Sequence, residues 1–118
     1  MPEVAFRHVD IVFGRSPERA LELLDRGEGR EAILERTGQV IGVADATVAI
    51  EEGEICVLMG LSGSGKSTLL RCVNRLNKAT RGEVLVEDAN GPVDVARCDL
   101  ATLRRLRTRR IAMVFQQF

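Results

Sequence analysis

A glycine-rich segment at residues 60–68 constrains the fold of this chain more than any other feature. It reads Gly-Leu-Ser-Gly-Ser-Gly-Lys-Ser-Thr, which satisfies the pattern GxxxxGK followed by serine or threonine. The apolar residues 54–59 precede it, as expected for a central strand buried on both faces, and leucines at helical spacing follow it. A strand, a loop and a helix in this order predict an α/β fold built around a phosphate-binding loop, the P-loop.

The P-loop residues suit the chemistry of a nucleoside triphosphate. Those expected to bind it are Gly60, Ser62, Gly63, Ser64, Gly65, Lys66, Ser67 and Thr68. Glycines let the backbone approach phosphate oxygens, because they lack a Cβ and tolerate positive φ. Lys66 would place a positive charge at the β- and γ-phosphates, and the Ser67 hydroxyl would complete the coordination of Mg²⁺. The alternative is a glycine-rich turn without a ligand, but such a turn needs only one or two glycines.

Residues 15–38 are expected to form a helical insert between strands. Ser16 is placed as an N-cap, and Pro17 occupies the first helical position, where its missing N–H costs nothing. A second short helix is predicted at residues 31–36, with Gly38 placed to end it. We interpret the insert as a surface hairpin packed over a sheet edge, with a regulatory or partner-docking role as the alternative.

Alternating apolar residues predict strands on both sides of the insert. These strands are expected at residues 4–13, 40–43, 47–50, 83–87 and 93–95. Asp99 is placed to cap a helix that runs through Leu100, Leu103 and Leu106, and residues 111–118 begin another apolar strand. His8, the only histidine, is expected on an edge strand.

Composition excludes several classes of protein. Seventeen basic residues balance seventeen acidic ones, so no overall field attracts the chain to nucleic acid or to an anionic membrane. The three cysteines, Cys56, Cys72 and Cys98, lack the spacing of a disulfide framework or a zinc site, and a reducing cytoplasm suits them best. Cys56 and Cys72 are expected as small core residues. The apolar runs stop far short of the roughly 18 to 20 residues that a membrane span requires.

The P-loop and its neighbours resemble the ATP-binding subunits of ABC transporters. Residues 60–70 combine the glycine-serine-glycine loop with the following leucines that are typical of these subunits. Residues 50–54 resemble the turn before the central strand, and residues 80–84 resemble the start of the next strand. Residues 111–116 resemble the Q-loop. The resemblance covers nearly the whole chain.

The insert narrows this resemblance to one group of importers. Together with residues 59–62 and 73–76, it is most similar to the ATPases of quaternary-ammonium importers, which take up glycine betaine, proline betaine or choline. The choline type is the nearest. The resemblance implies ATP and Mg²⁺ as cofactors, and an ATPase that couples ATP binding and hydrolysis to transport.

The resemblance also assigns roles to individual residues. Phe13 matches the aromatic of the A-loop that stacks on adenine, where the family more often has tyrosine; the alternative is a core residue that ends a strand. Gln116 matches the Q-loop glutamine, which helps to position Mg²⁺ and the attacking water and lies where the ATPase touches its membrane subunit. Lys66 and Gln116 are thus the expected catalytic residues, and Ser67 and Gln116 the expected metal-binding ones.

The resemblance implies a P-loop NTPase fold in which residues 1–118 form the N-terminal portion of one ABC nucleotide-binding domain, with an antiparallel β subdomain. Residues 54–77 are its strand, P-loop and helix, and residues 111–118 the start of the Q-loop. In the family, the signature motif, the Walker B aspartate, the catalytic glutamate and the switch histidine follow the Q-loop, and this chain ends at Phe118. We expect the chain alone to bind MgATP weakly and not to hydrolyse it.

The implied partners follow from the same family. They are a second ATPase subunit in a homodimer, an inner-membrane permease and, indirectly, an external substrate-binding protein. The protein would then lie peripherally on the cytoplasmic face of the inner membrane. Which quaternary amine is transported depends on the permease and the binding protein.

Three alternatives remain beside this interpretation. The arginines between residues 97 and 110 could bind nucleic acid, although they alternate with leucines as the solvated face of an amphipathic helix does, and no nucleic-acid partner is expected. Another P-loop protein, such as a small-molecule kinase or a GTPase, would need lid arginines or an NKxD element, and neither is recognisable. A non-catalytic nucleotide-binding remnant is the third alternative.

Overall fold

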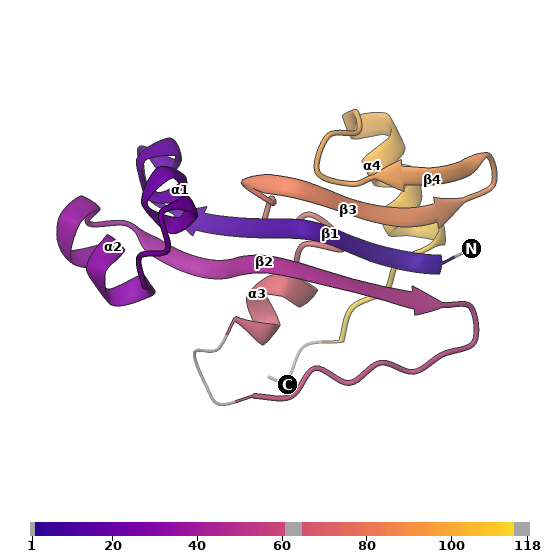
Figure 1. Ribbon diagram of the computed structural model, residues 1–118. Helices are drawn as coiled ribbons and strands as arrows, with labels where there is room; N and C mark the ends of the chain where they lie inside the picture. The colour runs from indigo at the N-terminus through magenta and orange to yellow at the C-terminus, as the bar shows by residue number, and fades with distance from the viewer. Residues whose placement is uncertain (1, 61–64, 115–118) are drawn as a thin grey trace.

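A computed structural model describes residues 2–60 and 65–114 of the protein. The strands are β1 (Pro2–Phe13), β2 (Val40–Glu51), β3 (Arg81–Asp88) and β4 (Gly91–Asp94). The helices are α1 (Pro17–Asp25), α2 (Arg30–Thr37), α3 (Lys66–Leu70) and α4 (Leu100–Arg109). The strands form one antiparallel sheet in the order β2-β1-β3-β4 (Figure 1). The predicted antiparallel β subdomain and helical insert are therefore both present.

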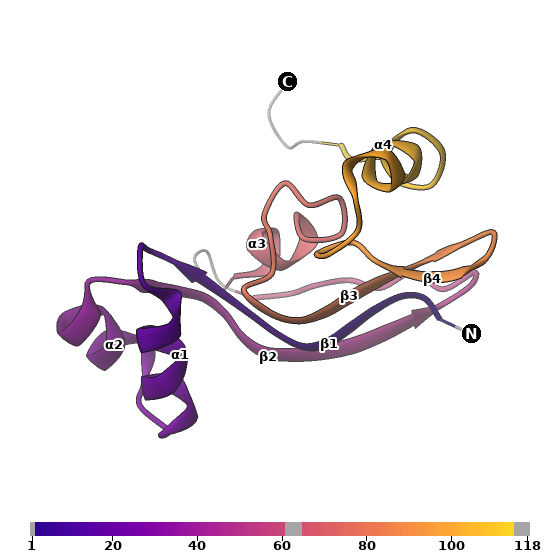
Figure 2. The same ribbon diagram turned by 90° about the horizontal axis from the view of Figure 1, so that it is seen from above.

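Two hydrophobic clusters hold the helices against the sheet. In Figure 2, α3 and α4 lie on one face of the sheet, whereas α1 and α2 lie beyond the other face, at one end. The fully buried members of the main cluster include Val9, Ile11, Cys72, Val84, Val95 and Leu106. A smaller cluster joins α1 and α2 to the ends of β1 and β2, and it consists of Val12, Ala20, Ile33 and Ile41. Successive residues of a strand point to opposite faces, so β1 supplies Ile11 to one cluster and Val12 to the other.

The two helices of the insert form where the sequence predicts them. Ser16 is the N-cap residue of α1 and Pro17 its first residue, although the Ser16 side chain makes no capping hydrogen bond. Gly38 follows α2 with a left-handed φ of 73°, and its N–H donates to the Leu34 carbonyl oxygen. A left-handed residue at this place ends a helix at little cost only when it is glycine.

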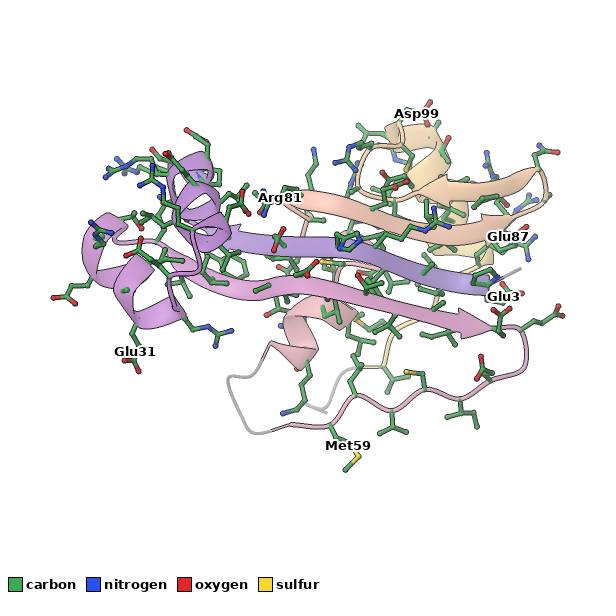
Figure 3. The ribbon with its side chains drawn as sticks, viewed as in Figure 1. Glu3, Glu31, Met59, Arg81, Glu87 and Asp99 are labelled. Atoms are coloured by element: carbon green, nitrogen blue, oxygen red, sulfur yellow. The ribbon has the colours of Figure 1, made fainter. Side chains whose placement is uncertain are left out.

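One arginine joins the insert to the sheet, and Figure 3 shows it at the end of β3 that lies nearest to α1. Arg81 donates from Nε to Asp10 Oδ2 at 2.8 Å, and from Nη1 and Nη2 to the two carboxylate oxygens of Asp25 at 3.0 and 2.8 Å. Asp10 is buried on β1, and its other oxygen accepts the N–H of Asp45. The hydrogen bond from Arg81 lowers the pKa of Asp25, and the two carboxylates raise the pKa of Arg81. Charge pairing as well as packing therefore holds α1 in place.

The expectation that His8 lies on an edge strand is wrong. β1 lies between β2 and β3, and its register with β2 shifts between Phe6 and Val9. His8 has a φ of 50° at this bulge, and its Nδ1 lies 2.7 Å from Asp45 Oδ1. A bulge arises from the pairing of two strands, so the alternation of one strand does not reveal it.

The predicted buried strand at residues 54–59 is absent. This segment has no strand assignment, and Ile55, Val57 and Met59 are 92%, 70% and 87% exposed. Figure 3 shows the Met59 side chain pointing away from the sheet. A central strand needs neighbours that satisfy its backbone groups, and none of the strands in the described residues pairs with this segment. Cys56 is accordingly exposed rather than a core residue.

The helix after the P-loop is shorter than its leucine spacing predicts. α3 ends at Leu70, and residues 71–77 form turns. Arg75 has a left-handed φ of 60°, and its Nη1 donates to the carbonyl oxygens of Val95 and Cys98. Left-handed backbone at a residue with a side chain is incompatible with an α-helix, so these long-range bonds coincide with the end of the helix. Cys72, just after it, is buried as predicted.

The C-terminal segments agree with the sequence in part. Asp99 caps α4 by accepting the N–H of Thr102 at 2.9 Å, and Leu103 and Leu106 are buried on its inner face, both as predicted. Residues 111–114 form no strand, and residues 115–118 lie outside the described part of the chain.

Candidate nucleotide-binding site

The end of the P-loop lies against β2 through two glycines. Gly65 has a left-handed φ of 93°, and a Cβ at this position would lie 2.3 Å from the carbonyl oxygen of Gly42. The N–H of Leu69 donates to the Gly65 carbonyl oxygen at 2.9 Å, which forms the first turn of α3. Only glycine at residue 65 satisfies both the backbone conformation and this close approach.

Lys66 joins the two ends of the loop. Its Nζ donates to the Gly60 carbonyl oxygen at 2.7 Å. Lys66 and Ser67 line a cavity of about 360 Å³, whose other wall consists of Leu70 and residues 56–58. An ammonium group and a hydroxyl, the two groups needed to hold a phosphate and its counter-ion, therefore adjoin the same space.

The side chains of Phe13 and Thr68 both pack against Gly42. A Cβ at Gly42 would lie 2.7 Å from Phe13 Cε2 and 3.2 Å from Thr68 Cγ2. Phe13 ends β1 and is 45% exposed, so part of its ring remains open to solvent. The predicted base-stacking residue is thus brought next to the first turn of α3, which carries the predicted phosphate-binding side chains.

Four of the predicted site residues, Ser62, Gly63, Ser64 and Gln116, lie outside the described part of the chain. The structure brings together the others, which are Phe13, Gly60, Gly65, Lys66, Ser67 and Thr68. Their roles in binding and catalysis remain predictions.

A magnesium ion would depend on few protein ligands at this site. Within residues 2–60 and 65–114, no group of three or more His, Cys, Asp or Glu side chains could hold a metal ion. Ser67 is exposed beside Lys66, and its hydroxyl fits the preference of Mg²⁺ for oxygen ligands and retained waters. The other expected protein ligand, Gln116, lies outside the described residues, and the remaining ligands would come from phosphate oxygens and water.

A larger cavity, of about 500 Å³, lies between the sheet and α1. Its ionisable lining residues are His8, Asp10, Asp25, Asp45 and Arg81. These groups already pair with one another, and none of the predicted site residues lines the cavity. The smaller cavity beside Lys66 is therefore the better candidate for a phosphate site, because its donor groups match the anion.

Two residues of this region were missed by sequence reasoning. Gly42 lies inside β2, and an isolated glycine within a strand is a known sign of close backbone approach. Gln39 binds the backbone of Ser16, a residue 23 positions away, and no local pattern reveals such a contact.

The antiparallel sheet, the P-loop and the short helix after it define a P-loop nucleotide-binding fold. The sequence profile of ABC transporters matches residues 43–118, and the chain belongs to the ABC transporter family. A solved structure supports the fold: the ATP-binding cassette MJ0796, in a dimeric post-hydrolysis state bound to ADP and Pi, superposes with a TM-score of 0.66. It is 29% identical, and the match covers 97% of this chain and 39% of that chain.

Curated relatives point to one group within the family. The glycine betaine/proline betaine transport system ATP-binding protein ProV of Salmonella typhimurium is 53% identical over 107 residues, which is 91% of this chain and 26% of ProV. The glycine betaine/carnitine transport ATP-binding protein GbuA of Listeria monocytogenes is 38% identical over 118 residues, which is 100% of this chain and 29% of GbuA. The chain therefore spans between a quarter and a third of the length of these relatives.

No helix within the described residues is long and apolar enough to span a bilayer.

Proposed function

We propose that this protein is the ATP-binding subunit of an importer for glycine betaine and related quaternary amines, and that it couples ATP binding and hydrolysis to uptake. In this assignment, residues 1–118 are the N-terminal portion of one nucleotide-binding domain. Residues 15–38 are its insert, residues 54–77 contain its P-loop, and residues 111–118 begin its Q-loop. One observation carries the nucleotide-binding part of the proposal: Phe13, Thr68 and Gly65 all contact Gly42, beside Lys66.

The geometry supports a nucleotide whose base and phosphates bind to two different parts of the fold. Phe13, half-exposed at the end of β1, stacks on adenine, while Lys66 binds the phosphates. Ser67 and Gln116 hold Mg²⁺, which when bound neutralises charge on the phosphate oxygens. Lys66 and Gln116 serve as catalytic residues. The other P-loop residues proposed to bind the nucleotide are Gly60, Ser62, Gly63, Ser64, Gly65 and Thr68.

The substrate class rests on the relatives. Both ProV and GbuA are named for glycine betaine, whereas the sequence resemblance placed the choline type nearest. Names shared by relatives of up to 53% identity favour glycine betaine or proline betaine over choline.

The proposed partners are a second copy of the ATPase, an inner-membrane permease and, indirectly, an external binding protein. The dimeric state of MJ0796 supports the homodimer. This arrangement places the protein peripherally on the cytoplasmic face of the inner membrane. The 118-residue chain alone binds MgATP weakly and does not turn it over, because no general base or signature motif is recognisable in its sequence.

Replacing the P-loop lysine tests the nucleotide site. Lys66→Ala should weaken MgATP binding by about tenfold to a hundredfold, the range expected for a lost charge-assisted hydrogen bond. Lys78→Ala is the matched control, because Lys78 is the other lysine of the chain and is exposed. Titration calorimetry measures both affinities, and thermal melting checks that both variants remain folded. Unchanged MgATP affinity in Lys66→Ala contradicts the assignment.

The substrate class has its own measurement. The full-length protein, co-expressed with a permease and a binding protein of a glycine betaine importer in cells that lack betaine uptake, should restore accumulation of labelled glycine betaine, and Lys66→Ala should abolish it. Uptake of choline without glycine betaine would overturn the substrate class while leaving the ATPase assignment intact.

A further inference from the structure

Gln39 is a buried polar side chain at the base of the insert. It is 4% exposed and lies between α2 and β2. Its Oε1 accepts the N–H of Ser16 at 3.2 Å, and its Nε2 donates to the carbonyl oxygen of Ser16 at 2.6 Å. Its own N–H donates to Thr37 Oγ1 at 3.1 Å. The side-chain amide therefore satisfies both backbone groups of one residue, which fixes that residue as a strand partner would.

The segment that Gln39 holds begins immediately after Phe13. A Cβ at Gly14 would lie 2.4 Å from Gln39 Cγ, so the glutamine stem packs directly on the Gly14 backbone. Phe13 itself pairs with Val40, the residue next to Gln39. Residues 13–16 are thus fixed at three successive points, by strand pairing, by packing and by hydrogen bonds.

This fixation determines where the Phe13 ring lies. The ring contacts the Cα side of Gly42, next to Thr68, and remains 45% exposed. An aromatic ring that ends a strand would otherwise be free to turn with the loop that follows it. A ring held in place before the ligand arrives binds without the entropy cost of being ordered.

We propose that Gln39 is a positioning residue of the nucleotide site: by clamping residues 14–16 it holds the Phe13 ring beside Gly42 and Thr68 for stacking on the base. The proposal rests on the proposed function, because it takes the stacking role of Phe13 as given. It also gives the insert a part in nucleotide binding, since Ser16 lies at the start of the insert and Gln39 directly follows its last residue.

Comparing ATP with inorganic tripolyphosphate tests this role, because the second ligand has no base. Gln39→Met keeps the length and burial of the side chain and removes both hydrogen bonds. It should weaken ATP binding by about threefold to tenfold, the range of one net hydrogen bond, and leave tripolyphosphate binding unchanged within about twofold. Phe13→Ala should show the same selectivity. Because both changes act through one ring, the double variant should bind ATP no more weakly than Phe13→Ala.

Two controls separate positioning from general loosening of the insert. Leu21→Ala trims a side chain that packs against the smaller hydrophobic cluster, and it should leave the ratio of the two affinities unchanged. Gln39→Glu turns the donor that faces the Ser16 carbonyl oxygen into a carboxylate oxygen at a buried position, so it should weaken ATP binding at least as much as Gln39→Met. Thermal melting verifies that each variant is folded.

The outcomes distinguish the two proposals. If Phe13→Ala does not change the ratio of ATP to tripolyphosphate affinity, base stacking by Phe13 is wrong and the role of Gln39 is wrong with it. If Phe13→Ala changes the ratio and Gln39→Met does not, or if the two losses are additive, only the role of Gln39 is overturned. Equal loss of both ligands in Gln39→Met also overturns it, because that result describes a structural residue.

Discussion

At Gly42, three parts of the chain meet one residue, two beside its Cα and one at its carbonyl oxygen. The P-loop reaches it through Gly65, α3 through Thr68, and β1 through the ring of Phe13. A protein interior packed to this density has no room for an added methyl group unless one of the neighbours moves. Gly42 therefore links the position of the Phe13 ring to the position of the P-loop at Gly65.

Gly42→Ala should be destabilising by about 1–3 kcal/mol, because it overpacks a buried position and pushes against Phe13 and Thr68. Gly29→Ala is a matched control, since a Cβ at Gly29 meets nothing within 4 Å and its φ is −81°. That change should cost no more than about 1 kcal/mol, because Gly29 is the N-cap of α2, where alanine is less favoured than glycine. Urea unfolding of both variants measures the difference. Equal stability of the two would show that the sheet adapts to a side chain at Gly42.

The cysteines should differ sharply in reactivity. Burial raises the pKa of Cys72 to about 11, whereas Cys56 is exposed. Because the thiolate is the nucleophile, iodoacetamide at pH 8 should modify Cys56 and spare Cys72 in the folded protein. Burial of the neutral thiol contributes stability below its ordinary pKa of 9.0, and this contribution is lost as the pH rises toward 11. Peptide mass spectrometry reads out the labelling.

Unfolding the chain in guanidinium chloride is the control for this experiment, since both thiols should then react at similar rates. Rapid modification of Cys72 in the folded protein would show that the region after α3 opens readily.

At the scale of elements, Arg81 holds the insert by pairing with two aspartates that differ in burial. Asp10 is buried with a side chain 4% exposed, whereas the side chain of Asp25 is 58% exposed. Arg81 connects them and is itself 42% exposed. A buried carboxylate depends on its partners far more than an exposed one, because water cannot replace a lost hydrogen bond.

Arg81→Met should therefore cost about 1–3 kcal/mol, the penalty for leaving a buried acceptor without a partner. Asp25→Asn removes only the exposed end and should cost less. Urea unfolding of the two variants checks the order. A larger loss in Asp25→Asn would mean that the insert, rather than Asp10, depends most on Arg81.

Acid should loosen the same connection. The hydrogen bond from Arg81 lowers the pKa of Asp25 below its ordinary value of 3.8. The stability that this pair contributes is present above pH 3.8 and is lost as the pH falls through the lower pKa of the folded state. The protection factors of the α1 amides, which correct for the slower intrinsic exchange in acid, should fall on acidification, and Asp25→Asn should already show lower protection at neutral pH.

At the scale of the whole molecule, one side is markedly apolar. Ile55, Val57 and Met59 project from an extended segment, and a cavity of about 280 Å³ lies between residues 111–114 and the strands β1 and β2. Exposed apolar surface of this kind promotes association in water.

The purified 118-residue chain should therefore bind a hydrophobic dye and associate as its concentration rises. Val57→Glu should reduce both effects. Leu34→Glu provides the control, because Leu34 is 48% exposed on α2 and should not contribute to this surface. Dye fluorescence and sedimentation measure the two effects, and equal association in all three proteins would place the contact elsewhere.

Features that depend on a few neighbouring residues could be predicted from the sequence. Pro17 at the start of α1, Gly38 at the end of α2 and Asp99 at the cap of α4 each act through local backbone geometry. The left-handed Gly65 and the start of α3 at Lys66 belong to the same group, since both follow from local backbone geometry.

Features that depend on distant pairing could not be predicted. The bulge at His8 requires β1 and β2 to be paired, and the bond between Arg81 and Asp10 spans 71 residues. The segment 54–59 has the composition of a buried strand, but composition does not supply neighbouring strands. For the site, the contacts of Gly42 with Phe13 and Gly65 became visible only once the sheet was formed.

The unequal ends of the Arg81 connection also bear on how this family can diverge. Replacing Arg81 in a relative would leave the buried carboxylate of Asp10 without its partner, so residues 10 and 81 should change together. Residue 25, whose side chain is exposed, can change independently. Among relatives, the presence of aspartate at residue 10 should then predict arginine at residue 81, whereas aspartate at residue 25 should not.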